Sequence, residues 1–241
     1  MVEKRIIPCL DIRDGRVVKG KKFQNVKDVA NPVDLAKKYE NDGADVLFLL
    51  DITGADRDTF LTIVREVKNA TSLPLYVGGG IRSLDDIKDT LAAGAAKVSI
   101  TSAAINHPNL MKEAAEQFGK DKLILSIDAK RVAEGKWHAF TNGGQKDSGL
   151  DVIEWAKTNE PYVSEILLNS IDMDGVKDGY DLALNKAVKE AVRIPVIASG
   201  GAGKIEHFVT VLNEGFASSA LAASVFHYGE ISIQDIKRAL Q

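Results

Sequence analysis

The stretch Ile194-Pro-Val-Ile-Ala-Ser-Gly-Gly-Ala-Gly203, followed directly by Lys204-Ile-Glu-His-Phe208, combines a strand, a glycine-rich turn and the start of a helix. The apolar run 195–198 has the composition of a buried strand, and a helical pattern begins right after Gly203. Glycines at such a junction let the backbone approach an anion closely, and the N–H groups that open the following helix point toward it. This stretch alone fits a phosphate-binding turn and a ligand-free turn equally well.

The same alternation of a short apolar strand and a helical segment recurs along the whole chain. Strands are expected at 5–12, 45–52, 74–80, 97–102, 123–130, 165–172, 195–198 and 219–226. Helices are expected near 31–43, 58–69, 83–94, 108–119, 151–158, 182–191, 204–213 and 233–240. Between the first strand and the first helix we expect a long polar connection, and at 131–149 a β-hairpin.

These units predict the class of fold. Strands this apolar are typical of a parallel sheet with both faces buried, and eight strand–helix units match an α/β protein of the (β/α)8 TIM-barrel type. No linker or change of composition divides residues 1–241, so we expect a single domain. A doubly wound open sheet is the alternative, but it requires a switch point that no feature of the sequence marks.

Corresponding strand ends recur after about half the chain. The pairs are Asp11 with Asp128, Asp51 with Asp172, Gly79 with Gly200, and Ser102 with Ser224. Four pairs in the same order indicate a two-fold repeat, with half-barrels at approximately 1–120 and 121–241. In an eight-stranded barrel, strand n and strand n+4 lie opposite each other, so the members of each pair are expected to face across the barrel mouth.

The repeat predicts what lies at that mouth. Active sites of this fold lie at the carboxyl ends of the strands, often with a phosphate site after strands 7 and 8. We therefore expect two facing phosphate cradles, one at Gly79 and Ser102 and the other at Gly200 and Ser224. Asp11 and Asp128, between them, are candidates for general base and general acid, or else bond to the loops that follow them.

Other residues near the mouth are open to two interpretations. Asp51, Asp172 and Asp174 could bind substrate hydroxyls, although Asp174 precedes Gly175 and equally suits a turn. Lys19, in the first connection, could close over a phosphate or simply be an exposed lysine. The four histidines lack metal-ligand spacing, so we expect neither a metal nor another cofactor.

Composition excludes several classes of protein. A net charge of −3 gives no overall attraction for nucleic acid, and no apolar run is long enough to span a membrane. The single cysteine, Cys9, excludes an internal disulfide and fits a reducing cytoplasm. The N-terminal residues do not resemble a signal peptide. We therefore expect a cytoplasmic protein whose anionic ligand is held by local groups.

Motifs along nearly the whole chain resemble a known family. They are CLDIRDGRVVKG at 9–20, VGGGIRS at 77–83, SIDAKRV at 126–132, SIDMDG at 170–175, ASGGAGKIEHF at 198–208 and ALAASVFH at 220–227. Together they resemble the cyclase subunits of imidazole glycerol phosphate synthase. The related isomerase of histidine biosynthesis shares the half-barrel repeat but lacks the first and fifth of these motifs.

The resemblance implies a lyase that acts in histidine biosynthesis. It would convert phosphoribulosyl-formimino-aminoimidazole carboxamide ribotide and ammonia to imidazole glycerol phosphate and aminoimidazole carboxamide ribotide, with Asp11 and Asp128 as the acid–base pair. Ammonia would come from a glutaminase subunit docked on the N-terminal face of the barrel. The implied residues for the bisphosphorylated ribotide are Lys19, Gly79, Gly80, Thr101, Ser102, Asn169, Asp174, Gly175, Ser199, Gly200, Gly201, Ala223 and Ser224.

The sequence departs from that family at several positions. Arg5, Lys97 and Glu165 match the family's ammonia entrance, but Val46 stands where a glutamate is usual, which leaves an excess of positive charge. Thr101 replaces a usual asparagine, and Asn169 and Val176 replace usual threonines. A paralogue or ribotide isomerase that acts on another bisphosphorylated or sugar-phosphate substrate is therefore the alternative to the cyclase.

Overall fold

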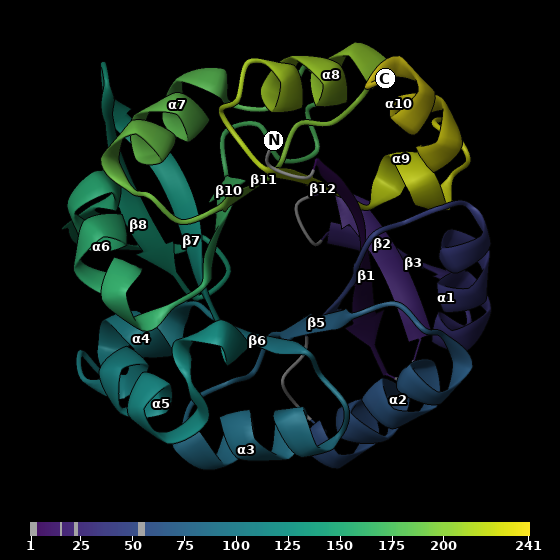
Figure 1. Ribbon diagram of the computed structural model, residues 1–241, viewed down its shortest axis with the longest axis horizontal. Helices are drawn as coiled ribbons and strands as arrows, with labels where there is room; N and C mark the ends of the chain where they lie inside the picture. Colours follow the sequence, from purple (N-terminus) through teal and green to yellow (C-terminus); the bar gives the residue numbers. More distant parts are fainter. Residues whose placement is uncertain (1–3, 15, 22–23, 53–55) are drawn as a thin grey trace.

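Eight parallel strands form a closed barrel in the computed structural model, and helices surround it (Figure 1). The structure describes residues 4–14, 16–21, 24–52 and 56–241, with the backbone alone for those between 19 and 29. In spatial order the barrel strands are β1 (Arg5–Arg13), β4 (Leu47–Asp51), β5 (Leu75–Gly78), β6 (Lys97–Ile100), β7 (Leu123–Ala133), β10 (Glu165–Ser170), β11 (Val196–Ser199) and β12 (Ser219–Ala222). Pairing of β12 with β1 closes the ring, which confirms the predicted (β/α)8 barrel.

The helices follow the strands as the sequence predicts. The long ones are α1 (Pro32–Asn41), α2 (Arg57–Ala70), α3 (Leu84–Ala92), α5 (Leu110–Phe118), α6 (Val152–Asn159), α7 (Leu182–Ala191), α8 (Ile205–Asn213) and α10 (Ile233–Ala239). Local sequence sets where they begin. The Asn31 side chain accepts hydrogen bonds from two N–H groups that open α1, and Ser83 and Asp86 form a capping box at α3. Two short 3-10 turns, η1 (Lys120–Lys122) and η2 (Glu160–Tyr162), also lie among the described residues.

Three predicted segments differ in the structure. The expected polar connection contains two strands, β2 (Arg16–Lys21) and β3 (Gln24–Ala30), which extend β1 as an antiparallel sheet. Their polar composition hid them, because a two-stranded extension can form on backbone pairing without a continuous apolar face. The strands expected at 97–102 and 219–226 end early, because the short helices α4 (Ser102–Asn106) and α9 (Ser224–His227) begin there.

A second antiparallel extension follows the barrel strand opposite β1. The strands β8 (Lys136–Thr141) and β9 (Lys146–Asp151) continue the sheet from β7, so the hairpin expected at 131–149 is present. β1 and β7 are four places apart in the ring of eight, so the two extensions occupy corresponding places in the two halves of the chain. This placement agrees with the repeat inferred from the spacing of the motifs.

Alternating side chains divide the apolar residues into two cores. Residues of one parity, such as Ile6 and Leu10 on β1, pack with the helices in the larger core between barrel and helices. Residues of the other parity fill the barrel interior: Ile7, Cys9, Val46, Phe48, Tyr76, Ile124, Leu167, Ile197 and Leu221. The interior is therefore packed and mainly apolar along its middle.

Glycine is required where β5 leaves the barrel. Gly79 has a φ of +85°, and a Cβ added there would lie 2.1 Å from the carbonyl oxygen of Asp51. Gly200 is the corresponding residue after β11: its φ is +89°, and an added Cβ would lie 2.7 Å from the carbonyl oxygen of Ser170. In both places a turn lies directly against the end of the neighbouring strand, which leaves no room for a side chain.

We expect Gly79→Ala to lower the free energy of unfolding by more than Gly119→Ala does. Gly119 has the same φ of +85°, but an added Cβ would meet nothing within 4 Å. Backbone strain alone costs about 1–3 kcal/mol, and an overlap with fixed backbone typically adds about 1–3 kcal/mol. Urea unfolding of both variants measures the difference; equal losses would show that the turn can move away from Asp51.

Candidate active site

Two aspartates lie on opposite sides of the barrel mouth. Asp11 is near the carboxyl end of β1, and Asp128 is on β7 at the residue where antiparallel pairing with β8 begins. These strands are opposite in the ring of eight, as the sequence predicts. Asp11 is only 6% exposed, and the Cys9 thiol lies one turn of the pleat below it, with Sγ 3.5 Å from Asp11 Oδ1. The thiol of the single cysteine is thus a direct neighbour of this carboxylate.

Asp128 has a perturbed ionisation. Burial raises the pKa of its carboxyl group, and the negative charge of Asp174 raises it further. A hydrogen bond from Asn169 Nδ2 to Asp128 Oδ1, 3.0 Å long, opposes this shift because it stabilises the carboxylate. The result is a carboxyl group that holds its proton to a higher pH than an ordinary aspartate, which suits proton transfer.

The first predicted cradle is formed by the turns after β5 and β6. Gly79 and Gly80 both have positive φ values, +85° and +66°. Thr101 precedes α4 as its N-cap residue, and Ser102 is the first residue of that helix. The Ser102 hydroxyl accepts a hydrogen bond of 3.1 Å from the backbone N–H of Asn142, between β8 and β9. The second antiparallel extension therefore contacts this cradle.

The second cradle has the same construction after β11 and β12. Gly200 and Gly201 again have positive φ values, +89° and +107°. A Cβ on Gly201 would lie 1.9 Å from the carbonyl oxygen of Gly179, so the loop before α7 holds this turn in place. Ala223 precedes α9 with φ −124° and ψ −72°, close to the −115° and −93° of Thr101 before α4. The backbone at the two cradles is thus similar although the side chains differ.

The loop after β10 carries the remaining predicted residues of the mouth. Asp172 Oδ2 accepts a hydrogen bond of 2.8 Å from the backbone N–H of Arg131, and Gly175 forms a turn with φ +75°. A groove of about 710 Å³ lies between this loop and the extension of β7, lined in part by Asp172 and Met173. Asp172 therefore joins the loop after β10 to β7 at the rim of the mouth. The negative charge of Asp174, in contrast, raises the pKa of Asp128. The Lys19 side chain lies outside the described residues.

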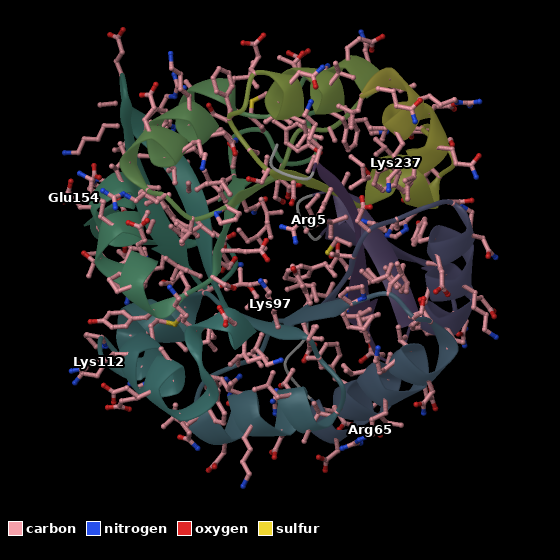
Figure 2. All side chains as sticks on the ribbon, in the orientation of Figure 1. Arg5, Arg65, Lys97, Lys112, Glu154 and Lys237 are labelled. Carbon is pink, nitrogen blue, oxygen red and sulfur yellow. The ribbon has the colours of Figure 1, made fainter. Side chains whose placement is uncertain are left out.

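Charged residues form a second polar cluster at the opposite end of the barrel. Figure 2 shows Arg5 and Lys97 within the ring of strands, whereas Arg65 and Lys112 lie on the outer side. Both cations bind Glu165: Arg5 Nη2 pairs with Oε2, and Lys97 Nζ lies 2.5 Å from Oε1. We call Arg5, Tyr76, Lys97 and Glu165 the N-terminal ring, because each lies at or next to the first residue of its strand.

Tyr76 is a member of this ring that the sequence analysis missed. Its hydroxyl donates to Glu165 Oε1 at 2.8 Å and accepts from Arg5 Nη1 at 2.9 Å. Val46, the substituted position, is 2% exposed and packs in the apolar interior with Tyr76. The sequence did contain a signal for this role of Tyr76: a side chain with a polar hydroxyl at an inward-facing position next to the start of β5. The tyrosine thus adds a neutral hydrogen-bonding group to a ring that has two cations and one carboxylate.

The ionisation of the ring follows from these contacts. Burial alone would raise the pKa of Glu165, but the hydrogen bonds and charges of Arg5 and Lys97 outweigh it, and the pKa is lowered. Burial and the charge of Glu165 raise the pKa of Tyr76 to about 12. At neutral pH the ring therefore contains an ionised carboxylate, two cations and a neutral phenol.

Among the described residues, no group of three or more histidine, cysteine, aspartate and glutamate side chains is arranged to hold a metal ion. Within the same residues, no helix has the length and apolar character needed to cross a membrane.

Comparison with known proteins shows the family to which the chain belongs. The model of the family described as "Histidine biosynthesis protein" matches residues 5–232. The chain is 54% identical over 243 aligned residues to the imidazole glycerol phosphate synthase subunit HisF of Oceanobacillus iheyensis, and the alignment covers all of this chain and 95% of that protein. The range matched by the family model contains both cradles, both mouth aspartates and the N-terminal ring. The chain therefore belongs to the histidine biosynthesis protein family.

Proposed function

We propose that this protein is the cyclase subunit of an imidazole glycerol phosphate synthase. Its substrates would be phosphoribulosyl-formimino-aminoimidazole carboxamide ribotide and ammonia, and its products imidazole glycerol phosphate and aminoimidazole carboxamide ribotide. The observation that carries this proposal is the pair Asp11 and Asp128, which face each other across the mouth between two similar glycine turns. A substrate with a phosphate at each end would span the turns and hold its reacting centre between the carboxylates.

The phosphates would bind backbone groups of the two cradles. Gly79 and Gly80 with the start of α4 would hold one, and Gly200 and Gly201 with the start of α9 the other. Glycine allows the chain to approach the anion, and N–H groups at the start of a helix favour negative charge. Binding at both ends would orient the substrate without any metal or cofactor in our proposal.

Proton transfer would be divided between the two aspartates. The raised pKa of Asp128 favours its protonated form as the general acid, and Asp11 would then be the base. The charge of Asp174 would raise the pKa of Asp128, and Asn169 would face the substrate. Thr101, Ser102, Gly175, Ser199, Ala223 and Ser224 would complete the binding surface around the substrate, and Lys19 would close over it.

Ammonia would arrive through the barrel from a glutaminase subunit on the N-terminal face. Two features support this route: the N-terminal ring at that end, and the apolar interior that connects it to the mouth. An uncharged molecule crosses such an interior at lower cost than an ion does. We propose a heterodimer located in the cytoplasm, where the single buried cysteine would stay reduced.

We expect Asp11→Asn and Asp128→Asn each to reduce ammonium-dependent product formation by about 10²–10⁴-fold, because each removes a proton-transfer group. Purified protein is incubated with the ribotide and an ammonium salt, and imidazole glycerol phosphate is measured. Asp121→Asn, the same change on the exposed η1 turn, is the matched control and should keep full activity. Full activity in either mouth variant would contradict the acid–base roles. Isomerised ribotide without imidazole product from the native chain would instead favour the isomerase.

We expect Tyr76→Phe to impair use of glutamine-derived ammonia more than use of added ammonium. The change removes one hydrogen bond each from Arg5 and Glu165 and so loosens the ring at the proposed entrance. The ratio of glutamine hydrolysed to product formed, measured with the glutaminase subunit, should rise above that of the native chain. Tyr162→Phe, on the outer η2 turn, is the control. An unchanged ratio in Tyr76→Phe would remove the tyrosine from the proposed route.

A further inference from the structure

Two side chains on adjacent strands, Asn169 and Ser199, link Asp128 to the second cradle. Asn169 on β10 is in register with Asp128 on β7 and with Ser199 on β11. Asn169 Nδ2 donates to Asp128 Oδ1 at 3.0 Å, and Ser199 Oγ donates to Asn169 Oδ1 at 3.1 Å. Ser199 is the last residue of β11, directly before Gly200. The chain Ser199–Asn169–Asp128 therefore runs from the cradle to the acid–base group.

The Asn169 amide has a defined orientation in this series of hydrogen bonds. In its ionised form Asp128 only accepts hydrogen bonds, so that form requires the N–H end of the amide, and the carbonyl end then needs a donor. The hydroxyl of Ser199, 9% exposed, supplies that donor. The turn itself lies against the same atom, because a Cβ on Gly200 would be 3.3 Å from Asn169 Oδ1. The opposite orientation would set the amide oxygen against the carboxylate.

We propose that Asn169 is a positioning residue whose amide, oriented by Ser199, joins the second cradle to Asp128 and sets how readily that carboxyl group ionises. This inference rests on the proposed acid–base function of Asp128. It gives Asn169 a role in orienting and stabilising Asp128, in addition to the substrate contact proposed above. An asparagine can perform it because it offers a donor and an acceptor at opposite ends of one rigid group.

Other charged groups around Asp128 do not replace this link. Asp174, after β10, acts on it with a charge that raises its pKa. Lys130, on the same strand, lies 5.6 Å from the centre of the Phe140 ring of β8. Lys97 on β6 and Glu165 on β10 are bonded to each other at the far end of the barrel. Among the described residues, the Asn169 amide is thus the group whose hydrogen bond stabilises the carboxylate form of Asp128.

The test is a titration of Asp128 by carbon NMR in the free protein with labelled aspartate, where the Asp128→Asn spectrum identifies the signal. Asn169→Leu removes the N–H donor, so we expect the Asp128 titration to move to higher pH. Ser199→Ala, which leaves the Asn169 amide in place, should move it in the same direction but less. In the double variant, Ser199→Ala should add nothing to Asn169→Leu. Ser170→Ala changes a buried residue next to Asn169 on β10 and should leave the Asp128 titration unchanged.

Two results would overturn the link: no movement of the Asp128 titration in Ser199→Ala, or equal movement by Ser199→Ala with and without Asn169. Ser199→Ala removes one oxygen and keeps the backbone, so it serves even if Asn169→Leu does not fold. Kinetics add a second measurement, with kcat reduced about tenfold or more in Asn169→Leu. The titration needs no substrate, so it tests the link from Ser199 through Asn169 to Asp128 even if the chain proves not to be a cyclase.

Discussion

Closure of the sheet by the hydrogen bonds between β12 and β1 is the constraint on which the rest of the structure depends. In a closed parallel barrel, every strand has the same direction, so all carboxyl ends meet at one mouth. Residues that are far apart in sequence, such as Asp11 and Asp128, are thereby brought to the same level on opposite sides. The alternation of side chains then sends every second residue into the interior. The site is therefore a consequence of strand direction and parity as much as of its individual residues.

Parity also explains the layered character of the interior. Along β1, Arg5, Ile7, Cys9 and Asp11 all point inward, so one strand supplies an ion-pair partner, two apolar contacts and a mouth carboxylate. β10 does the same with Glu165, Leu167 and Asn169. Burying charge at both ends is costly unless each group is paired, and here the described charged groups have partners. The apolar middle contributes stability while the two ends remain available for chemistry.

Much of this arrangement could be predicted from the sequence because it depends on local patterns. Short apolar runs gave the strands, and the recurrence of Asp, Gly and Ser at strand ends gave the opposition of the two halves. Interactions between strands left weaker signals. The bond from Tyr76 to Glu165 and the chain from Ser199 to Asp128 depend on register, which no single segment contains. The strands β2 and β3 were missed because their residues lack an apolar alternation strong enough to distinguish a strand from a loop.

The mainly apolar middle of the barrel also separates the polar cluster at one end of the interior from the polar cluster at the other. Side chains such as Phe48, Ile124 and Leu167 fill most of the space between the ring at one end and the aspartates at the other, with the buried Ser99 and Ser126 at inward positions among them. Apolar side chains do not carry protons, so most of this segment offers no path for proton exchange between the two ends. The barrel therefore places an ion-paired cluster and a buried carboxyl group at opposite ends of one axis. Filling the middle with apolar side chains keeps these two polar clusters of one fold from contacting each other.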